Sequence, residues 1–327
     1  MNELERRLAF IASPEDLARV RSLSPADLPR FSVVIPSFNQ GKFLAQTLDS
    51  VISQEYPNTD IFVADGGSTD GSVDILEDYA RRSNGLLRYD SRPDGGHYQG
   101  VNKGIANTSG EVIAWINSDD VYLPGAFWKV AAFFCYNRSA FVVYGRNTYV
   151  DEYLNTITDY PVDWSPLLGE QRRRMMHFCI VPQPSLFFRR EAVLLCGDLA
   201  SKILDYELWL RWQRNLPFYF YDDYLSLSRV HQKAITANPN KQLLLHICKT
   251  VHDYYGAVPL SWAFKYAYTV TYGAAWTRGE HPAVGHMIRA RAYLQWLWLN
   301  IRWSPRMALR ALRWLAVWIQ QVQRISA

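Results

Sequence analysis

The chain has few cysteines and no long apolar run. Its four cysteines are scattered, and none belongs to a CxxC pair or lies near a histidine cluster, which disfavours a disulfide framework and a zinc site. No run of about 18 apolar residues occurs, so no membrane-spanning helix is expected. Residues 1–20 are charged and lack the apolar region of a signal peptide. These absences favour a cytoplasmic protein.

Charge is distributed unevenly along the 327 residues. Residues 1–240 carry 24 Lys plus Arg and 29 Asp plus Glu (24 − 29 = −5), whereas residues 241–327 carry 11 and 2 (11 − 2 = +9). The C-terminal segment also holds seven of the twelve Trp. We therefore expect an N-terminal helical arm over 1–30, an acidic main domain over 31–235 and a basic, Trp-rich helical appendage over 236–327.

The main domain, residues 31–235, alternates short apolar segments with helical patterns. Each apolar segment ends in a polar or Gly-rich turn, and the first two turns open helices with one apolar face. This order predicts βαβ units and a mostly parallel sheet flanked by helices. The predicted strands are Phe31–Ile35, Ile61–Ala64, Leu86–Tyr89, Val112–Ile116, Phe141–Tyr144 and Leu186–Phe188.

Two adjacent carboxylates follow the strand Val112–Ile116. Asp119 and Asp120 should lie at the carboxyl edge of the sheet, where open α/β sheets bind their ligands. Oxygen ligands there suit Mg²⁺ or Mn²⁺, which in turn suits a diphosphate. The alternative is that the two residues only cap the helix that begins near Pro124.

Three further loops are expected at the same edge. The loop after the first strand begins at Pro36, and the loop after the second begins at Asp65, an acidic position that often reads a nucleoside. Asp65 alternatively satisfies only the amides of its own turn. In the third loop and its helix, Asp94, Asn102 and Lys103 are candidate nucleotide contacts, although an exposed Lys is more often simply solvated.

Four motifs in this order resemble the family 2 glycosyltransferases. They are VVIPSFN, VADGGSTDG, RPDGGHYQGVNKGI and WINSDD, and together they span residues 31–125. The resemblance is closest to the bacterial polysaccharide-assembly branch. It implies the GT-A fold, a Rossmann-like α/β architecture, here with a C-terminal helical appendage. It also implies inverting transfer of a sugar from a nucleotide sugar, with Mn²⁺ or Mg²⁺ held by an Asp-x-Asp-like motif.

The chain departs from the family pattern at two positions. One acid is missing after Asp65, and Asn117 replaces the first acid of the Asp-x-Asp motif, so the metal should rest on Asp119 with Asp120 as helper. Asn117 remains able to hydrogen-bond the ribose or the ion. The full set of expected nucleotide contacts is Pro36, Ser37, Asn39, Asp65, Asp94, Asn102, Lys103, Asn117 and Ser118.

The resemblance also places the catalytic base. Asp205 matches the Asp that begins a helix in the family and removes the acceptor hydroxyl proton, and a helix N-terminus is expected to keep its pKa low. The alternative is a capping Asp. Arg229 and His231 match an Arg-x-His that approaches the diphosphate and sometimes the metal. Gln183 and Trp209 are candidate acceptor or sugar contacts, with core filling as the alternative for Trp209.

The C-terminal appendage is expected to form helices over residues 286–301 and 305–324. In the second helix Arg306, Arg310, Arg313 and Arg324 share one side, opposite a wide apolar face. This pattern fits an anionic membrane surface better than nucleic acid. Packing on the catalytic domain or on a second subunit is the alternative.

These features predict a glycosyltransferase of cell-surface polysaccharide biosynthesis, peripheral at the inner face of the cell membrane. A UDP-sugar is the expected donor, and a saccharide or lipid-linked saccharide the expected acceptor. A nucleotidyltransferase is an alternative, but it would need a basic Gly-rich loop where residues 36–41 stand. A nonreactive nucleotide-sugar-binding scaffold is the other alternative, and the presence of Asp119 and Asp205 disfavours it.

Overall fold

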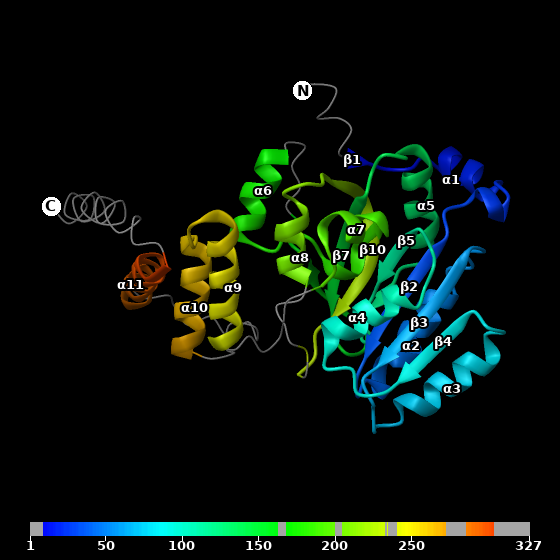
Figure 1. The fold of residues 1–327 in the computed structure, drawn as a ribbon, viewed down its shortest axis with the longest axis horizontal. Helices are drawn as coiled ribbons and strands as arrows, with labels where there is room; N and C mark the ends of the chain where they lie inside the picture. The colour runs from blue at the N-terminus through cyan, green and yellow to red at the C-terminus, as the bar shows by residue number, and fades with distance from the viewer. Residues whose placement is uncertain are drawn as a thin grey trace. The chain divides into compact units, whose positions relative to one another are not determined.

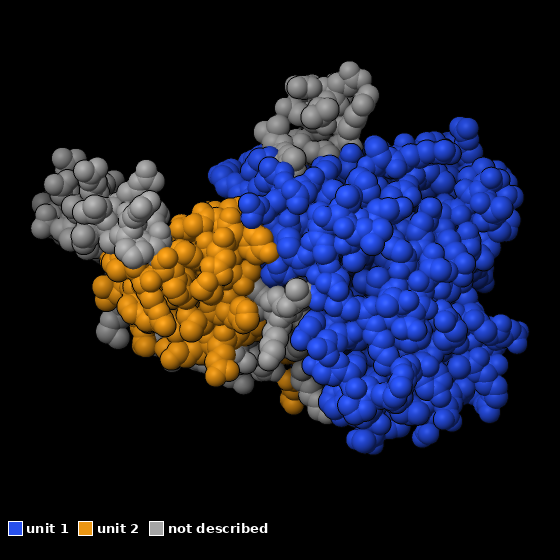
Figure 2. Space-filling view, viewed as in Figure 1, with its two compact units in different colours: residues 1–174, 179–231 blue, residues 175–178, 232–327 orange. Residues whose placement is uncertain are grey.

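The computed structural model describes residues 9–162, 168–199, 205–232, 234, 241–272 and 286–303. The chain forms two compact units, coloured separately in Figure 2. The first contains Met1–Arg174 and Cys179–His231, and the second contains Met175–Phe178 and Gln232–Ala327. The boundary after His231 lies four residues before the end of the predicted catalytic domain. The expected helix over 305–324 lies outside the described residues.

The first unit is built on a ten-stranded sheet with the order β1-β10-β7-β9-β5-β2-β3-β4 (Figure 1). Most neighbours are parallel, and β9 runs antiparallel to both β5 and β7. Short strands β6 and β8 pair antiparallel with β10 and β7. The strands are β1 Ala9–Phe10, β2 Phe31–Ser37, β3 Thr59–Asp65, β4 Leu87–Ser91, β5 Val112–Trp115, β6 Val121–Tyr122, β7 Val142–Val150, β8 Thr156–Asp159, β9 Leu186–Arg189 and β10 Phe218–Arg229.

Helices connect the strands and cover the sheet. Those that begin in the first unit are α1 Pro14–Arg21, η2 Pro25–Asp27, α2 Gly41–Ile52, α3 Ser72–Arg82, α4 His97–Ala106, α5 Ala126–Tyr136, α6 Leu168–His177, η3 Gln183–Ser185, α7 Glu191–Cys196 and α8 Asp205–Trp212. Helices α9 Lys241–Tyr255, α10 Leu260–Tyr272 and α11 His286–Trp303 belong to the second unit.

The predicted α/β architecture is confirmed, because all six predicted strands are present, although the strand predicted to end at Tyr144 continues as β7 to Val150. Strands β2 and β5 are completely buried, and their sequences, FSVVIPS and VIAW, are mostly apolar, as burial on both faces requires. Strand β10 is less evident in the sequence. Asp222 and Asp223 break its apolar run at the point where its register against β7 shifts.

Residues 9–30 pack as part of the first unit. Strand β1 pairs with β10, and Val20 and Leu28 are buried in the main core. The Tyr56 hydroxyl donates a hydrogen bond to the Pro29 carbonyl over 2.9 Å. The segment therefore extends the sheet and its core.

Helix α4 crosses β2 at Gly104, and we predict that Gly104→Ala destabilises the protein. An added Cβ would lie 2.3 Å from Cγ1 of Val34, so the helix must move away from the sheet. Alanine favours a helix by about 1 kcal/mol over glycine, but overpacking typically costs about 1–3 kcal/mol. We expect a lower free energy of unfolding by about 1 kcal/mol in urea titrations. The control is Gly169→Ala in α6, where an added Cβ would meet no neighbouring atom within 4 Å. This variant should not lower the free energy of unfolding.

The second unit contains three described helices. Loop residue Val258 fixes α11, since its carbonyl accepts from Trp296 Nε1 at 2.7 Å and its N–H donates to Asn300 Oδ1 at 2.9 Å. Among the described residues, no helix combines the length and apolar character needed to span a bilayer.

Candidate active site

The acidic loop after β5 meets the end of β10. Strand β6 follows this loop directly and pairs with β10, with Val121 opposite Leu227. The last residues of β10 and those just after it therefore return to the carboxylates that the sequence places at the sheet edge. In this way Arg229 and His231 reach a loop more than 100 residues earlier in the chain.

Asp119 and His231 are in direct contact. His231 Nε2 lies 2.9 Å from Asp119 Oδ2, and the two side chains are 3% and 16% exposed respectively. Arg229 contacts the backbone of the loop, because its Nη1 donates a hydrogen bond to the Asp119 carbonyl at 2.6 Å. Its guanidinium lies over the Phe43 ring, 4.4 Å from the ring centroid. The structure thus brings together three of the predicted site residues.

Asp120, the residue after Asp119, is buried. Its Oδ1 accepts the Arg229 backbone N–H at 2.9 Å. Burial, and then the neighbouring Asp119 charge, raise the pKa of Asp120 well above its ordinary value. A cation bound beside the pair would relieve this repulsion, so the electrostatics suit a metal ion.

The donor set is consistent with a divalent ion that takes part of its coordination from substrate. Among the residues that the structure describes, no three His, Cys, Asp or Glu side chains cluster as a complete metal site. Asp119 and His231 offer two donors. Mg²⁺ is typically held by one or two carboxylates together with substrate phosphates and water, so two protein donors suffice.

Asn117 belongs to a partly buried cluster of polar side chains next to the acidic loop. Its Oδ1 lies 2.8 Å from His97 Nε2, and its Nδ2 lies 3.0 Å from Gln183 Oε1. Burial lowers the pKa of His97, against the opposing effect of the bond to Asn117. Ser118, the next residue, is also buried. Gln183 is therefore a neighbour of the acidic loop.

Asp205 begins α8, but its pKa differs from the expectation. Its Oδ1 accepts the Tyr206 N–H at 2.9 Å, which lowers the pKa as predicted for a helix start. Burial acts in the opposite direction and dominates, so the pKa rises from 3.8 to about 6. The expected low pKa is therefore wrong, because the burial of the carboxyl group outweighs the effect of the helix start.

Helix α8, which Asp205 begins, packs against the end of β5. The rings of Trp209, one turn along α8, and Trp115, at the end of β5, have centroids 6.3 Å apart. Burial mainly raises the pKa of Tyr149, and the charges of Asp120 and Asp205 add to the rise. Since this effect falls with distance, the Tyr149 phenol lies within electrostatic reach of both carboxylates.

Three predicted contacts have other roles in the structure. Trp209 is fully buried and packs on Trp212 at 5.9 Å, so it fills the core and offers no ring face to a sugar. Asn102 uses its Nδ2 and Oδ1 to bind the Leu199 backbone at 2.7 and 3.1 Å, which holds the residues that follow α7. Lys103 Nζ lies 2.8 Å from Asp90 Oδ2.

Asp65 is also committed to its own loop. It is fully buried, and its carboxylate accepts from the N–H groups of Gly67 and Ser68 at 3.1 and 2.8 Å and from the Ser91 hydroxyl at 2.6 Å. Asn39 joins the first two loops, because its Oδ1 accepts the Thr69 N–H at 2.9 Å. These contacts favour the interpretation in which Asp65 holds its turn.

Pro36 and Asp94 line a narrow gap between loops. An added Cβ on Gly100 would lie 3.0 Å from Asp94 Oδ2 and 3.4 Å from Pro36 Cβ. An added Cβ on Gly66 would lie 3.5 Å from Asp94 Oδ1. The two glycines allow the loops after β2, β3 and β4 to approach one another closely. Ser37, at the end of β2, is buried beside them.

Sequence reasoning missed two side chains at this edge. Phe38 is 60% exposed and lies beside Gly66, a placement that suits stacking on a flat ring. His97 contacts Asn117 from the start of α4. Phe38 stands within the motif VVIPSFN, so an exposed aromatic in a loop was the available signal, whereas nothing in the sequence pairs His97 with Asn117.

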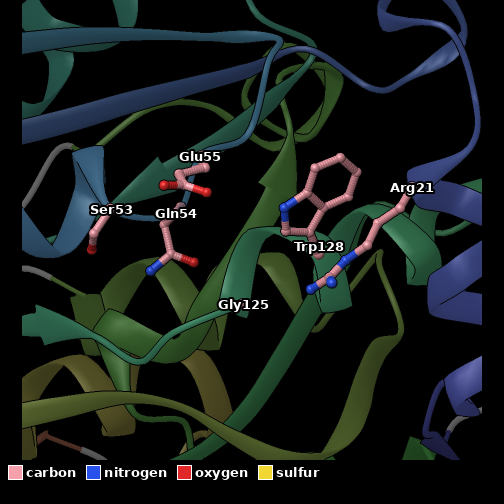
Figure 3. A pocket seen from close by; sticks show the side chains of 6 residues that line it. All are labelled: Arg21, Ser53, Gln54, Glu55, Gly125 and Trp128. Atoms are coloured by element: carbon pink, nitrogen blue, oxygen red, sulfur yellow. The ribbon is translucent and has the colours of Figure 1, made fainter.

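A separate cavity of about 340 Å³ lies away from these residues (Figure 3). Its walls come from residues 53–55 just after α2, from Arg21 in α1, from Gly125 just before α5 and from Trp128 in α5. Arg21 lies over the Trp128 ring at 5.5 Å. None of the predicted site residues lines it.

The first unit, a mostly parallel sheet with an acidic loop at its carboxyl edge, has the GT-A fold, as comparison with solved structures shows. S. aureus TarS 1–349 in complex with UDP-GlcNAc matches with a TM-score of 0.57 and 17% identity over 85% of this chain and 82% of that one. The Pyrobaculum calidifontis mannosyltransferase PcManGT, in complex with GDP-Man and Mn²⁺, matches with a TM-score of 0.52 and 15% identity over 94% and 86%.

Sequence comparison identifies the family. The model of glycosyl transferase family 2 matches residues 32–194, so these residues form a domain of that family. An uncharacterized glycosyltransferase of Rickettsia felis is 27% identical over 217 residues, 63% of this chain and 35% of the relative. Glycosyltransferase GlyG of Streptococcus pneumoniae is 36% identical over 90 residues, 28% of this chain and 30% of the relative. The chain spans about a third of the length of the first two curated relatives.

Proposed function

We propose that this protein is an inverting glycosyltransferase that moves a sugar from a nucleotide sugar to a saccharide or lipid-linked acceptor. The observation that carries the proposal is the meeting of Asp119 and His231 at the sheet edge, with Asp205 on the adjoining helix α8. Membership of family 2 supports the same reaction class. Cell-surface polysaccharide assembly is the process that we expect it to serve.

Asp119 and His231 would hold a divalent ion together with the diphosphate of the donor. The buried Asp120 would add a second carboxylate beside Asp119. Mn²⁺ or Mg²⁺ supplies Lewis-acid stabilisation of the negative charge that develops on the departing diphosphate. Asn39, Pro36 and Asp94 shape the loops around the nucleoside, and Phe38 offers an exposed ring for the base.

Asp205 acts as the general base in a single displacement. Its carboxylate takes the proton of the acceptor hydroxyl while the hydroxyl oxygen forms a bond to the anomeric carbon. The bond from that carbon to the diphosphate oxygen breaks, and the electron pair leaves with the nucleoside diphosphate. A pKa of about 6 keeps Asp205 ionised at neutral pH and basic enough to accept the proton.

The proposal is tested by a panel of nucleotide sugars incubated with the purified full chain and Mn²⁺. We expect release of nucleoside diphosphate from one donor and a rise in melting temperature with the same nucleotide. UDP-sugars come first and GDP-mannose second, since TarS and PcManGT are seen with UDP-GlcNAc and GDP-Man. A panel in which no donor is cleaved and none raises the melting temperature would contradict the proposal.

Helix α11 supports the proposed contact with an anionic membrane. Leu294, Trp298 and Ile301 lie on one face and are 64%, 47% and 40% exposed. Arg291 and Arg302 flank them, and the Arg302 guanidinium lies 4.9 Å from the Trp298 ring centroid. The helix contains no acidic residue. An exposed apolar face with arginines at its ends fits a bilayer rich in anionic lipid.

We predict that replacing Leu294, Trp298 and Ile301 together with Ser weakens membrane binding by at least about tenfold, because each buried apolar side chain contributes about 1.5–3 kcal/mol. The measurement is flotation of the full chain with phosphatidylcholine vesicles containing about a third phosphatidylglycerol. Leu194→Ser in α7, which removes an 81% exposed leucine, is the matched control. Equal flotation of both variants would remove the claim for α11.

A further inference from the structure

A chain of three hydrogen bonds runs behind the acidic loop. Gln183 Nε2 donates to the Trp115 carbonyl at 2.7 Å, Asn117 Nδ2 donates to Gln183 Oε1 at 3.0 Å, and His97 Nε2 lies 2.8 Å from Asn117 Oδ1. These residues come from the end of β5, the loop after it, η3 and the start of α4. The chain therefore ties four elements together beside Asp119.

The Trp115 carbonyl determines the direction of every bond in this chain. A carbonyl only accepts, so Gln183 must present its amino group there and its oxygen to Asn117. Asn117 must then present its amino group to Gln183 and its oxygen to His97. His97 must in turn carry a proton on Nε2. A residue at position 117 must therefore donate on one side and accept on the other, which an amide does and a carboxylate does not.

A carboxylate at position 117 would disturb two contacts. It would face Gln183 Oε1, now 3.0 Å from the Asn117 amino group, with an oxygen that has no proton to donate. It would also face Asp120 Oδ2, which lies 3.4 Å from the same amino group and belongs to a buried carboxylate. Rotation of the Gln183 amide would only move the conflict to the Trp115 carbonyl.

We infer that Asn117 is a positioning residue, not a metal ligand, and that His97 and Gln183 hold its amide so that the loop presents Asp119 to the site. The inference rests on the proposed function for its consequence in catalysis. It contradicts the simple expectation from the Asp-x-Asp pattern. Restoring an acid at position 117 should harm this site and not improve it.

The decisive variant is Asn117→Asp. We expect Mn²⁺ affinity in the presence of UDP, measured from free Mn²⁺ by electron paramagnetic resonance, to stay equal or fall, and turnover to fall about tenfold, the usual effect of losing an outer contact of a metal site. Tighter Mn²⁺ binding by Asn117→Asp would overturn the inference, because it would make position 117 a ligand position. Unchanged affinity with unchanged turnover would also overturn it.

Two variants of His97 distinguish the proposed positioning role from a general loss of the fold. His97→Gln keeps a donor close to the position of Nε2 and should retain Mn²⁺ affinity and turnover, whereas His97→Leu should lose about tenfold in one or both. Thermal melting of each variant verifies the fold. Wild-type behaviour of His97→Leu in both measurements would overturn the role of His97.

A spectroscopic readout separates this inference from the proposed function. In the full chain with ¹⁵N-labelled histidine, the His97 ring, assigned by its loss in His97→Gln, should show the proton on Nε2 and a bare Nδ1. This result does not depend on whether any nucleotide sugar is a substrate. The Nδ1–H form would overturn the directed chain, even if the protein proves to be a glycosyltransferase.

Discussion

Asp205→Asn should lower kcat about 1000-fold while leaving donor binding unchanged, because general-base catalysis typically contributes about 10²–10⁴-fold. The amide keeps the shape of the side chain but cannot take the proton of the acceptor hydroxyl. Initial rates with the donor found in the nucleotide-sugar panel measure the loss. Calorimetric titration with the corresponding nucleoside diphosphate and Mn²⁺ verifies that the donor site is intact.

The pKa of Asp205 gives this prediction two further signatures. The folded-state pKa of about 6 lies above the ordinary 3.8, so the active, ionised form of the free enzyme is lost as the pH falls through 6, and kcat/KM should fall tenfold per pH unit below it. The same shift means that the ionised carboxylate destabilises the folded protein at pH 8. Asp205→Asn should therefore raise the melting temperature at pH 8.

Asp74→Asn is the matched control, since Asp74 is an exposed acid in the first turn of α3. This variant should retain wild-type turnover and the same pH profile. Turnover in Asp205→Asn within a few-fold of wild type, with donor binding intact, would mean that another group takes the proton.

The sheet was predictable because a strand that is buried on both faces has a run of apolar residues in its own sequence. Strands β2 and β5 are buried along their whole length, and their mostly apolar sequences reveal them without any tertiary information. Strand β10 leaves a weaker mark, since Asp222 and Asp223 occupy a register shift against β7. An irregularity of pairing depends on the neighbouring strand and is therefore hard to recognise in one sequence.

The residue types of the site were more predictable than their environments. The contact of Asp119 with His231 agrees with the Arg-x-His resemblance, because both residues lie in motifs. The pKa of Asp205 was predicted in the wrong direction, since a helix start is visible in sequence but the burial around it is not. The sequence likewise leaves two roles open for Trp209, core filling and sugar contact. Its contacts with Trp115 and Trp212 in the structure decide for the core.

Asp119→Asn should lower kcat by about 100-fold or more, a loss typical of removing one electrostatic stabiliser of the developing charge. Asp119 is the partly exposed carboxylate of the loop and contacts His231 at 2.9 Å, whereas Asp120 faces inward to the Arg229 N–H. The amide keeps one weak oxygen donor but removes the charge that would attract a divalent ion. Mn²⁺ affinity measured in the presence of nucleoside diphosphate should therefore fall together with kcat.

The loss in Asp119→Asn should depend on Mn²⁺ concentration, which distinguishes it from the loss in Asp205→Asn. Raising Mn²⁺ from micromolar to millimolar should recover part of the turnover of Asp119→Asn, because weak binding is overcome by mass action. The same titration should not recover Asp205→Asn, whose defect lies in proton transfer. If Asp119→Asn binds Mn²⁺ as tightly as the wild type, the ion does not rest on Asp119, and the pair formed with His231 is structural.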